Sequence, residues 1–252
     1  PITLDDLSSG YNIDWNISTD ETFNAMMGFN ETEVREMFRY YQQNGMLAGD
    51  IEEMIKEMKP WYDNYCFARM SLNDDRVFNC DMTLYYLGHR VQKGRAPEEM
   101  VDKNIRTDYS KLKMLARIDR DTEQDGTRMS TIEEIATKGE ILVNLHTSFP
   151  AEKIADIDNF RCLLYYYGLL TMCGTRGDLI KMCIPNNCVR EQYFGFLREY
   201  YQQYSTIDLH YLNVMLTDLA YDGKWKSFFE SIAQAYRENS AVRDAMEEVG
   251  GQ

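Results

Sequence analysis

The chain has 252 residues, of which 44% are hydrophobic and only 5 are proline, and this composition excludes an intrinsically disordered chain. Its 27 Lys and Arg against 41 Asp and Glu give a net charge of −14 at pH 7, which argues against an extended phosphate-binding surface. The longest apolar run, residues 162–173, is too short for the roughly 20 residues that cross a bilayer, so we expect no membrane partner.

Two amphipathic helices are predicted near the beginning of the chain. Apolar residues recur at helical spacing over 31–43, and Asn30 with Glu33 forms the pattern of a capping box before them. A second helix is predicted to begin after Asp50 and to end at Pro60, because proline lacks the amide hydrogen that a helix interior needs.

A short β-hairpin is predicted near residues 61–79, where two apolar runs flank a polar turn. Helices are expected to follow at about 81–92 and 98–118. Residues 119–129 are polar and lack apolar periodicity, so we interpret them as a linker and place the main domain boundary after residue 128.

The second half of the chain is predicted to place a helix before a β-hairpin, which is how a winged-helix unit ends. Ser130 and Glu133 form a second capping-box pattern, and Gly139 is expected to close that helix. The further predicted elements are a strand at 141–145, a helix at 158–167, hairpin strands at 168–173 and 179–184, and helices at 187–204, 208–221 and 224–238.

The predicted fold class is therefore mainly α, with a helical lid-like region followed by a winged-helix module with small β-hairpins. The predicted domains are a lid-like region at 1–128, the winged-helix-like module at 129–205 and a helical C-terminal extension at 206–252.

Sequence patterns of catalytic centres are missing from the chain. It contains no G-x-x-x-x-G-K-[ST], G-x-G-x-x-G, H-E-x-x-H or G-x-S-x-G pattern, and its three His are far apart. We therefore predict no catalytic residue, no metal site and no cofactor in this chain, and we do not expect the chain alone to be an enzyme.

The six Cys include no C-x-x-C pair, so they are interpreted as reduced thiols of a cytoplasmic protein. The chain opens at Pro1 without a basic segment leading into an apolar one, so no secretory signal is predicted. A beginning at proline favours an excised or processed piece of a longer protein.

Five segments, taken in order, resemble a bacterial family of predicted AAA-ATPase-like proteins that usually carry a PD-(D/E)XK nuclease-like domain. Residues 61–67, Trp-Tyr-Asp-Asn-Tyr-Cys-Phe, are similar to the family motif W-Y-D-G-Y-x-F, with Asn64 in place of glycine. Asparagine tolerates a positive φ better than most residues, so we expect the turn to persist. The other four segments are 1–13, 77–87, 163–171 and 184–190.

The resemblance implies that the nucleotide-binding core lies before residue 1 and the nuclease-like domain after residue 252. The parent protein would then be an ATPase that uses ATP and Mg²⁺, and both neighbouring domains would be partners of this chain. The chain itself would be the non-catalytic lid and winged-helix portion, which couples the nucleotide state to a partner domain.

Two sets of residues are candidates for function. The resemblance favours a shared structural or interdomain site at Trp61, Tyr62, Asp63 and Tyr65. A phosphate-facing patch is the second candidate, and it would consist of Arg176, Lys181, Arg190 and Arg198. The alternatives for function are a nucleic-acid-binding winged-helix module, which the net charge disfavours, and a freestanding protein-interaction domain.

Overall fold

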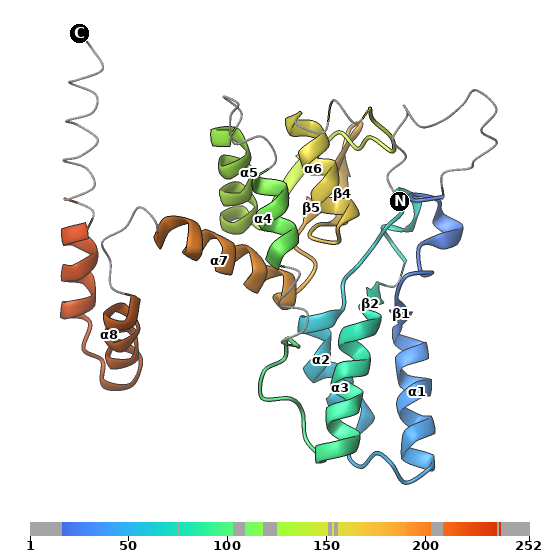
Figure 1. Cartoon of the computed structure of the whole chain (residues 1–252). Helices are drawn as coiled ribbons and strands as arrows, with labels where there is room; N and C mark the ends of the chain where they lie inside the picture. Colours follow the sequence, from blue (N-terminus) through green and yellow to red (C-terminus); the bar gives the residue numbers. More distant parts are fainter. Residues whose placement is uncertain are drawn as a thin grey trace. The chain divides into compact units, whose positions relative to one another are not determined.

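The computed structural model describes residues 17–74, 76–102, 109–117, 125–150, 153, 156–202, 209–235 and 237. This part of the chain is mainly helical and contains two small antiparallel sheets (Figure 1), which confirms the predicted mainly α class. Two compact units are present, one ending at Leu197 and one beginning at Arg198. The division into three domains after residues 128 and 205 stays a prediction.

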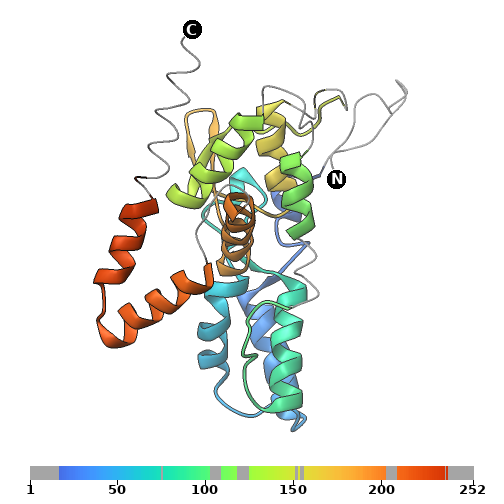
Figure 2. The ribbon, with the colours of Figure 1, turned by 60° about the vertical axis from the view of Figure 1, so that its left-hand side comes forward.

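The first part of the chain is built on three helices, α1 (Glu31–Gln43), α2 (Ile51–Tyr62) and α3 (Cys80–Lys93). They lie side by side in Figures 1 and 2, with α2 packed against both of the others. Their facing sides supply a core of buried apolar residues that includes Val34, Phe38, Met54, Met58, Tyr62, Met82 and Tyr86. Burial of this shared core, more than intrinsic helix propensity, stabilises the three helices.

The predicted start of α1 is confirmed. The Asn30 Oδ1 accepts a 2.9 Å hydrogen bond from the Glu33 amide, and the Asn30 amide donates to the Glu33 Oε2 at 2.8 Å. Two amides that the helix itself leaves without partners are satisfied in this way.

The predicted end of α2 at Pro60 is wrong, because the helix continues through Pro60 to Tyr62. Pro60 lies in the last turn, so a single intrahelical hydrogen bond is lost, and the Asp63 amide still donates to the Lys59 carbonyl at 3.2 Å. Complete burial of Tyr62 favours this extra turn.

The predicted hairpin near 61–79 is confirmed in part, because Tyr65 and Val77 exchange two backbone hydrogen bonds, at 3.2 Å and 3.1 Å. Strand β2 (Val77–Phe78) pairs with β1 (Phe29–Asn30), whereas Tyr65 makes an isolated antiparallel bridge to Val77. The strand that pairs with β2 thus lies nearly 50 residues away in sequence, and local patterning carries no signal for such a partner.

The second part of the first unit combines helices with a three-stranded antiparallel sheet in the order β3-β5-β4. In chain order its elements are α4 (Tyr109–Arg117), α5 (Asp125–Lys138), β3 (Glu140–Val143), α6 (Ile157–Tyr166), β4 (Thr171–Arg176), β5 (Leu179–Cys183) and α7 (Asn187–Gln202). The predicted sequence of helix, hairpin and helix from α6 to α7 is confirmed.

Helix α5 begins at Asp125, so the linker predicted at 119–129 is wrong for residues 125–129, and so is the predicted helix start at Ser130. Residues 119–124 of the predicted linker lie outside the described residues. Arg128 and Met129 are buried, which extends the packed face of the helix ahead of Ser130. Residues 98–102 are not helical, in contrast to the predicted helix at 98–118. The predicted closure by Gly139 is confirmed, with φ of 76° at that residue.

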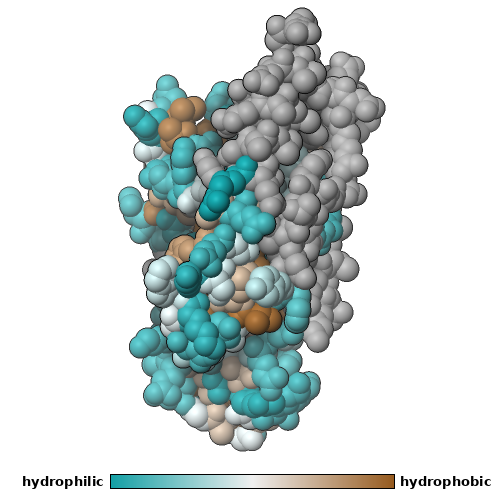
Figure 3. Space-filling view, turned by 90° about the vertical axis from the view of Figure 1, so that its left-hand side faces the viewer, coloured by the Kyte–Doolittle hydropathy of each residue, from teal (hydrophilic) through white to brown (hydrophobic). Residues whose placement is uncertain are grey.

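The second unit contains α8 (Leu209–Asp222) and a further helical stretch at 226–235, which meet at Gly223 as predicted. Among the described residues, no helix combines the length and the apolar character that crossing a membrane requires. Hydrophilic residues predominate on the face shown in Figure 3, with small hydrophobic patches among them.

The contact between Gly28 and β2 provides a test of this fold. A Cβ at residue 28 would lie 2.7 Å from two Val77 side-chain atoms and 2.8 Å from the Phe78 carbonyl oxygen. We expect Gly28→Ala to lower the free energy of unfolding by about 1–3 kcal/mol, measured by urea denaturation.

Gly88→Ala is the matched control, because a Cβ at this position inside α3 meets no atom within 4 Å. This change should stabilise the chain by about 0.5–1 kcal/mol through helix propensity alone. Equal effects of the two substitutions would contradict the packing of β1 on β2.

Candidate functional site: a joint between helices and sheet

Residues Asp63–Phe67, which we call the joint segment, connect the three-helix part to the three-stranded sheet. The Cys66 amide donates a 2.7 Å hydrogen bond to the Thr171 Oγ1, and this hydroxyl donates to the Cys66 carbonyl at 3.2 Å. The Met172 amide also donates to the Cys66 carbonyl at 3.2 Å. The joint segment is therefore bonded to the first residues of β4.

The loop between β5 and α7 makes a second connection to the joint segment. The Asn186 Nδ2 donates to the Asp63 carbonyl at 3.1 Å, and the Asn64 Nδ2 donates to the Pro185 carbonyl at 2.8 Å. Asn64 has φ of 84°. This left-handed conformation is one that asparagine tolerates better than most residues.

The aromatic residues of the predicted interdomain site are buried or half-buried inside the first unit. Tyr62 is fully buried, its hydroxyl donates to the Met100 carbonyl at 2.7 Å, and burial raises the pKa of Tyr62 well above its usual value. Tyr65 is 8% exposed, and its ring stacks on Phe67 with 5.8 Å between the centroids. Trp61 is half-buried. Within the described chain, these residues therefore contribute to packing.

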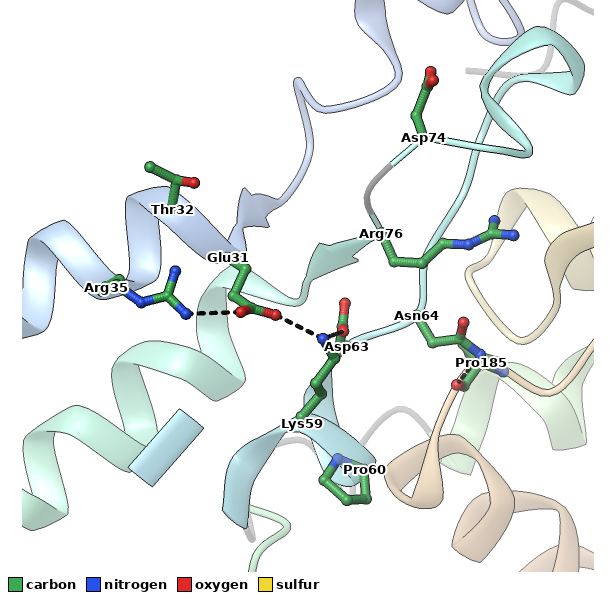
Figure 4. Close-up of a pocket in the computed structure, with 10 residues that line it drawn as sticks. All are labelled: Glu31, Thr32, Arg35, Lys59, Pro60, Asp63, Asn64, Asp74, Arg76 and Pro185. Carbon is green, nitrogen blue, oxygen red and sulfur yellow. Dashed lines mark hydrogen bonds and ion pairs between the residues drawn. The ribbon is translucent and has the colours of Figure 1, made fainter. Parts of the chain in front are cut away.

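A charged cavity of about 680 Å³ lies beside the joint segment (Figure 4). Its walls are formed by Glu31, Thr32, Arg35, Lys59, Pro60, Asp63, Asn64, Asp74, Arg76 and Pro185. The Lys59 Nζ lies 2.6 Å from the Glu31 Oε2, and the Glu31 Oε1 lies 2.8 Å from the Arg35 Nη2. These contacts lower the pKa of Glu31 and raise that of Lys59, so both groups are held in their charged forms.

Asp63 is the exceptional residue of this charged cavity. Its side chain is 6% exposed, and its Oδ1 is buried without a hydrogen-bond partner among the described residues. Burial raises the pKa of Asp63 above its ordinary value, and the backbone amide of Asn64 together with the Lys59 Nζ, 3.6 Å from the Oδ2, offsets this only in part. A buried carboxylate oxygen without a hydrogen-bond donor lowers the stability of the folded chain. Buried titratable groups of this kind are common at functional sites.

Arg76 is not the missing partner of Asp63. Its guanidinium donates to the Met172 carbonyl at 2.9 Å and to the Leu72 carbonyl at 3.1 Å, and Figure 4 shows it pointing away from Asp63. Lys59 is thus the cation nearest to this carboxylate in the cavity. In the part of the chain that the structure describes, no cluster of His, Cys, Asp and Glu could hold a metal ion.

The residues of the predicted phosphate-facing patch lie on two elements. Arg176 and Lys181 lie on one face of the β4–β5 hairpin, by the strand register, and Arg190 is exposed on α7. The Lys181 Nζ pairs with the Glu140 Oε1 at 2.8 Å, which reduces its availability to a phosphate. Arg198 belongs to the second unit.

The sequence analysis missed several residues that complete the site, namely Glu31, Lys59, Thr171, Pro185 and Asn186. Thr171, Pro185 and Asn186 lie within the segments that carry the family resemblance, but no local pattern connects them to residues 63–66. Lys59 and Asp63 are four residues apart and so share a helix face, which was a usable signal for their pairing.

Comparison with known proteins found no matching family model, no matching curated protein and no matching solved structure. The site is therefore interpreted from its own geometry.

Asp63→Asn tests the cost of the buried charge. We expect this change to raise the free energy of unfolding by about 1 kcal/mol at neutral pH, because asparagine keeps the shape and removes the charge. Since the folded pKa of Asp63 is raised, ionisation costs stability above that pKa and costs none below the ordinary value of 3.8. Urea denaturation should show the gain at neutral pH and its loss near that value.

Asp74→Asn is the control, because Asp74 borders the same cavity but is exposed. It should change the free energy of unfolding by less than about 0.5 kcal/mol at either pH. A clear loss of stability in Asp63→Asn at neutral pH would show that the carboxylate is well satisfied, contrary to our interpretation.

Two substitutions at Asn64 separate its hydrogen bond from its backbone conformation. Asn64→Gly removes the bond to Pro185 but keeps the positive φ accessible, and we expect a loss of about 1 kcal/mol. Asn64→Ala adds backbone strain, for a total loss of about 2–3 kcal/mol in urea denaturation. Equal losses in the two variants would mean that the turn does not require the left-handed conformation.

Proposed function

We propose that this chain is the non-catalytic lid and winged-helix portion of an AAA-type ATPase, and that it couples nucleotide state to a partner domain. The joint segment carries the proposal. It bonds the helical part to β4 through Cys66 and to the β5–α7 loop through Asp63 and Asn64. A displacement of α2 is thereby transmitted to the sheet, because tightly packed and bonded elements do not deform independently.

The order of elements supports the winged-helix part of the proposal. Helix α5 leads into β3, α6 leads into the β4–β5 hairpin, and β5 lies between β3 and β4 in the sheet. The nucleic-acid alternative has less support, since Lys181 is already paired with Glu140 and the chain carries a net charge of −14.

The charged cavity is the proposed contact with the nucleotide-binding domain. When a neighbouring polar surface approaches, its groups can replace members of the ion pairs and can donate a hydrogen bond to the Asp63 Oδ1. The contacts then differ between the two states of the neighbouring domain, as coupling requires. ATP and Mg²⁺ belong in this proposal to the parent protein. A cytoplasmic location is part of it as well, and it agrees with six cysteines that are all free thiols.

The test uses the complete polypeptide encoded by the gene. We expect an in-frame G-x-x-x-x-G-K-[ST] motif upstream of the Pro1 codon, and ATP hydrolysis by the complete polypeptide but not by these 252 residues. Thr171→Val removes both side-chain hydrogen bonds to Cys66, and it should lower the ATPase rate about fivefold or more while leaving the Kd for ATP unchanged.

Thr175→Val, on the exposed part of β4, is the matched control and should leave the rate unchanged. If Thr171→Val does not fold, Asn64→Gly weakens the same joint more mildly. A start codon next to Pro1, or an unchanged rate in a folded joint variant, would overturn the proposal. In the first case, a freestanding protein-interaction domain becomes the better interpretation.

A further inference from the structure

A second cavity, which we call the aromatic cavity, is bordered by Trp61 and has a volume of about 770 Å³. Its walls come from both parts of the first unit. The apolar residues that border it include Phe23, Met26, Met27, Trp61, Tyr65, Phe67, Phe78, Met82, Tyr165, Tyr166, Tyr167, Leu169 and Val189. This size and this lining are typical of sites that bind small molecules.

Two side chains at the aromatic cavity, Gln192 and Asp81, offer oxygen atoms that accept hydrogen bonds. Gln192 is 7% exposed, and its Oε1 is buried without a hydrogen-bond partner among the described residues. Asp81, exposed at the beginning of α3, is the one charged residue among those that border the cavity. A buried amide oxygen without a donor is costly, so the site is complementary to a ligand that supplies one.

Three other polar groups of the lining already have partners. The Tyr165 hydroxyl donates to the Phe67 carbonyl at 2.7 Å, and the Tyr166 hydroxyl donates to the His146 carbonyl at 3.0 Å. The Asn186 Nδ2 is used by the Asp63 carbonyl. The Gln192 Oε1 and the Asp81 carboxylate are therefore the acceptors on which the proposal for this site rests.

We propose that the aromatic cavity binds a small organic amine, with an apolar body among the aromatic rings and a protonated nitrogen that donates to the Gln192 Oε1. Aromatic faces attract cations, and the carboxylate of Asp81 adds attraction of the same sign. Exposed Met26 and Met27 provide an adaptable rim for the apolar body. An anionic ligand would meet neither a lysine nor an arginine among these bordering residues.

Calorimetric titration of the 252-residue chain with three probes of similar size and different charge tests this proposal. The probes are 2-phenylethylamine, which is a cation at neutral pH, 2-phenylethanol, which is neutral, and 3-phenylpropionate, which is an anion. We expect the amine to bind about fivefold or more tightly than the alcohol, and the acid to bind more weakly than both.

Gln192→Met keeps the length of the side chain and removes the oxygen, so it should weaken amine binding about fivefold and leave alcohol binding less affected. Gln92→Met, at an exposed position of α3 outside the cavity, is the matched control. Asp81→Asn changes an exposed side chain without risk to the core, and it should weaken amine binding about twofold and reduce its dependence on salt.

Equal affinities for the three probes would overturn the proposed selectivity, and so would unchanged amine binding in folded Gln192→Met. Absence of binding at about 10 mM amine would overturn the site itself, since so weak an affinity is negligible for a specific pocket. The proposal does not depend on the proposed function, because the titration needs neither nucleotide nor a neighbouring domain.

Discussion

The first unit depends on the reciprocal hydrogen bonds between Thr171 and Cys66. One hydroxyl satisfies both backbone groups of a residue 105 positions earlier in the chain, at a site closed to water. Buried backbone groups must find partners, so the loss of this side chain would leave the Cys66 amide unsatisfied, while the Cys66 carbonyl would keep only its hydrogen bond from the Met172 amide. This constraint fixes the position of the three-helix part relative to the sheet. The hydrogen bonds of Asn64 and Asn186 hold the two parts in the same position.

The joint segment also separates two cavities of opposite chemical character. Trp61 at the end of α2 borders the aromatic cavity, while Lys59 and Asp63, on either side of it in sequence, border the charged cavity. Asn186 borders the aromatic cavity and bonds the Asp63 carbonyl, so it contacts both environments. A change in either cavity would therefore act on the same few hydrogen bonds, which gives the region a physical basis for communication.

The Asp63 Oδ1 and the Gln192 Oε1 are two buried oxygens without a hydrogen-bond partner among the described residues, and each belongs to a residue that borders one of the two cavities. An apolar or smaller residue at either position would avoid the cost of burial. Proteins tolerate such costs mainly where a ligand or a partner later supplies the missing group, so stability and function oppose each other at these positions. Each cavity holds one of the two oxygens, and this agrees with the separate proposals for an interdomain contact and a ligand site.

The sequence by itself determined the local features, because their signals lie within a few residues. The capping box at Asn30, the mainly helical class and the α6–hairpin–α7 order were predictable from spacing and backbone preference. The turn with a positive φ at Asn64 was expected only from the family resemblance. Tertiary structure decided which distant segments meet. Helix α2 continues through Pro60, β2 pairs with β1, and Thr171 lies against Cys66. These features were not predictable, because burial and backbone pairing between distant segments leave no local pattern in the sequence.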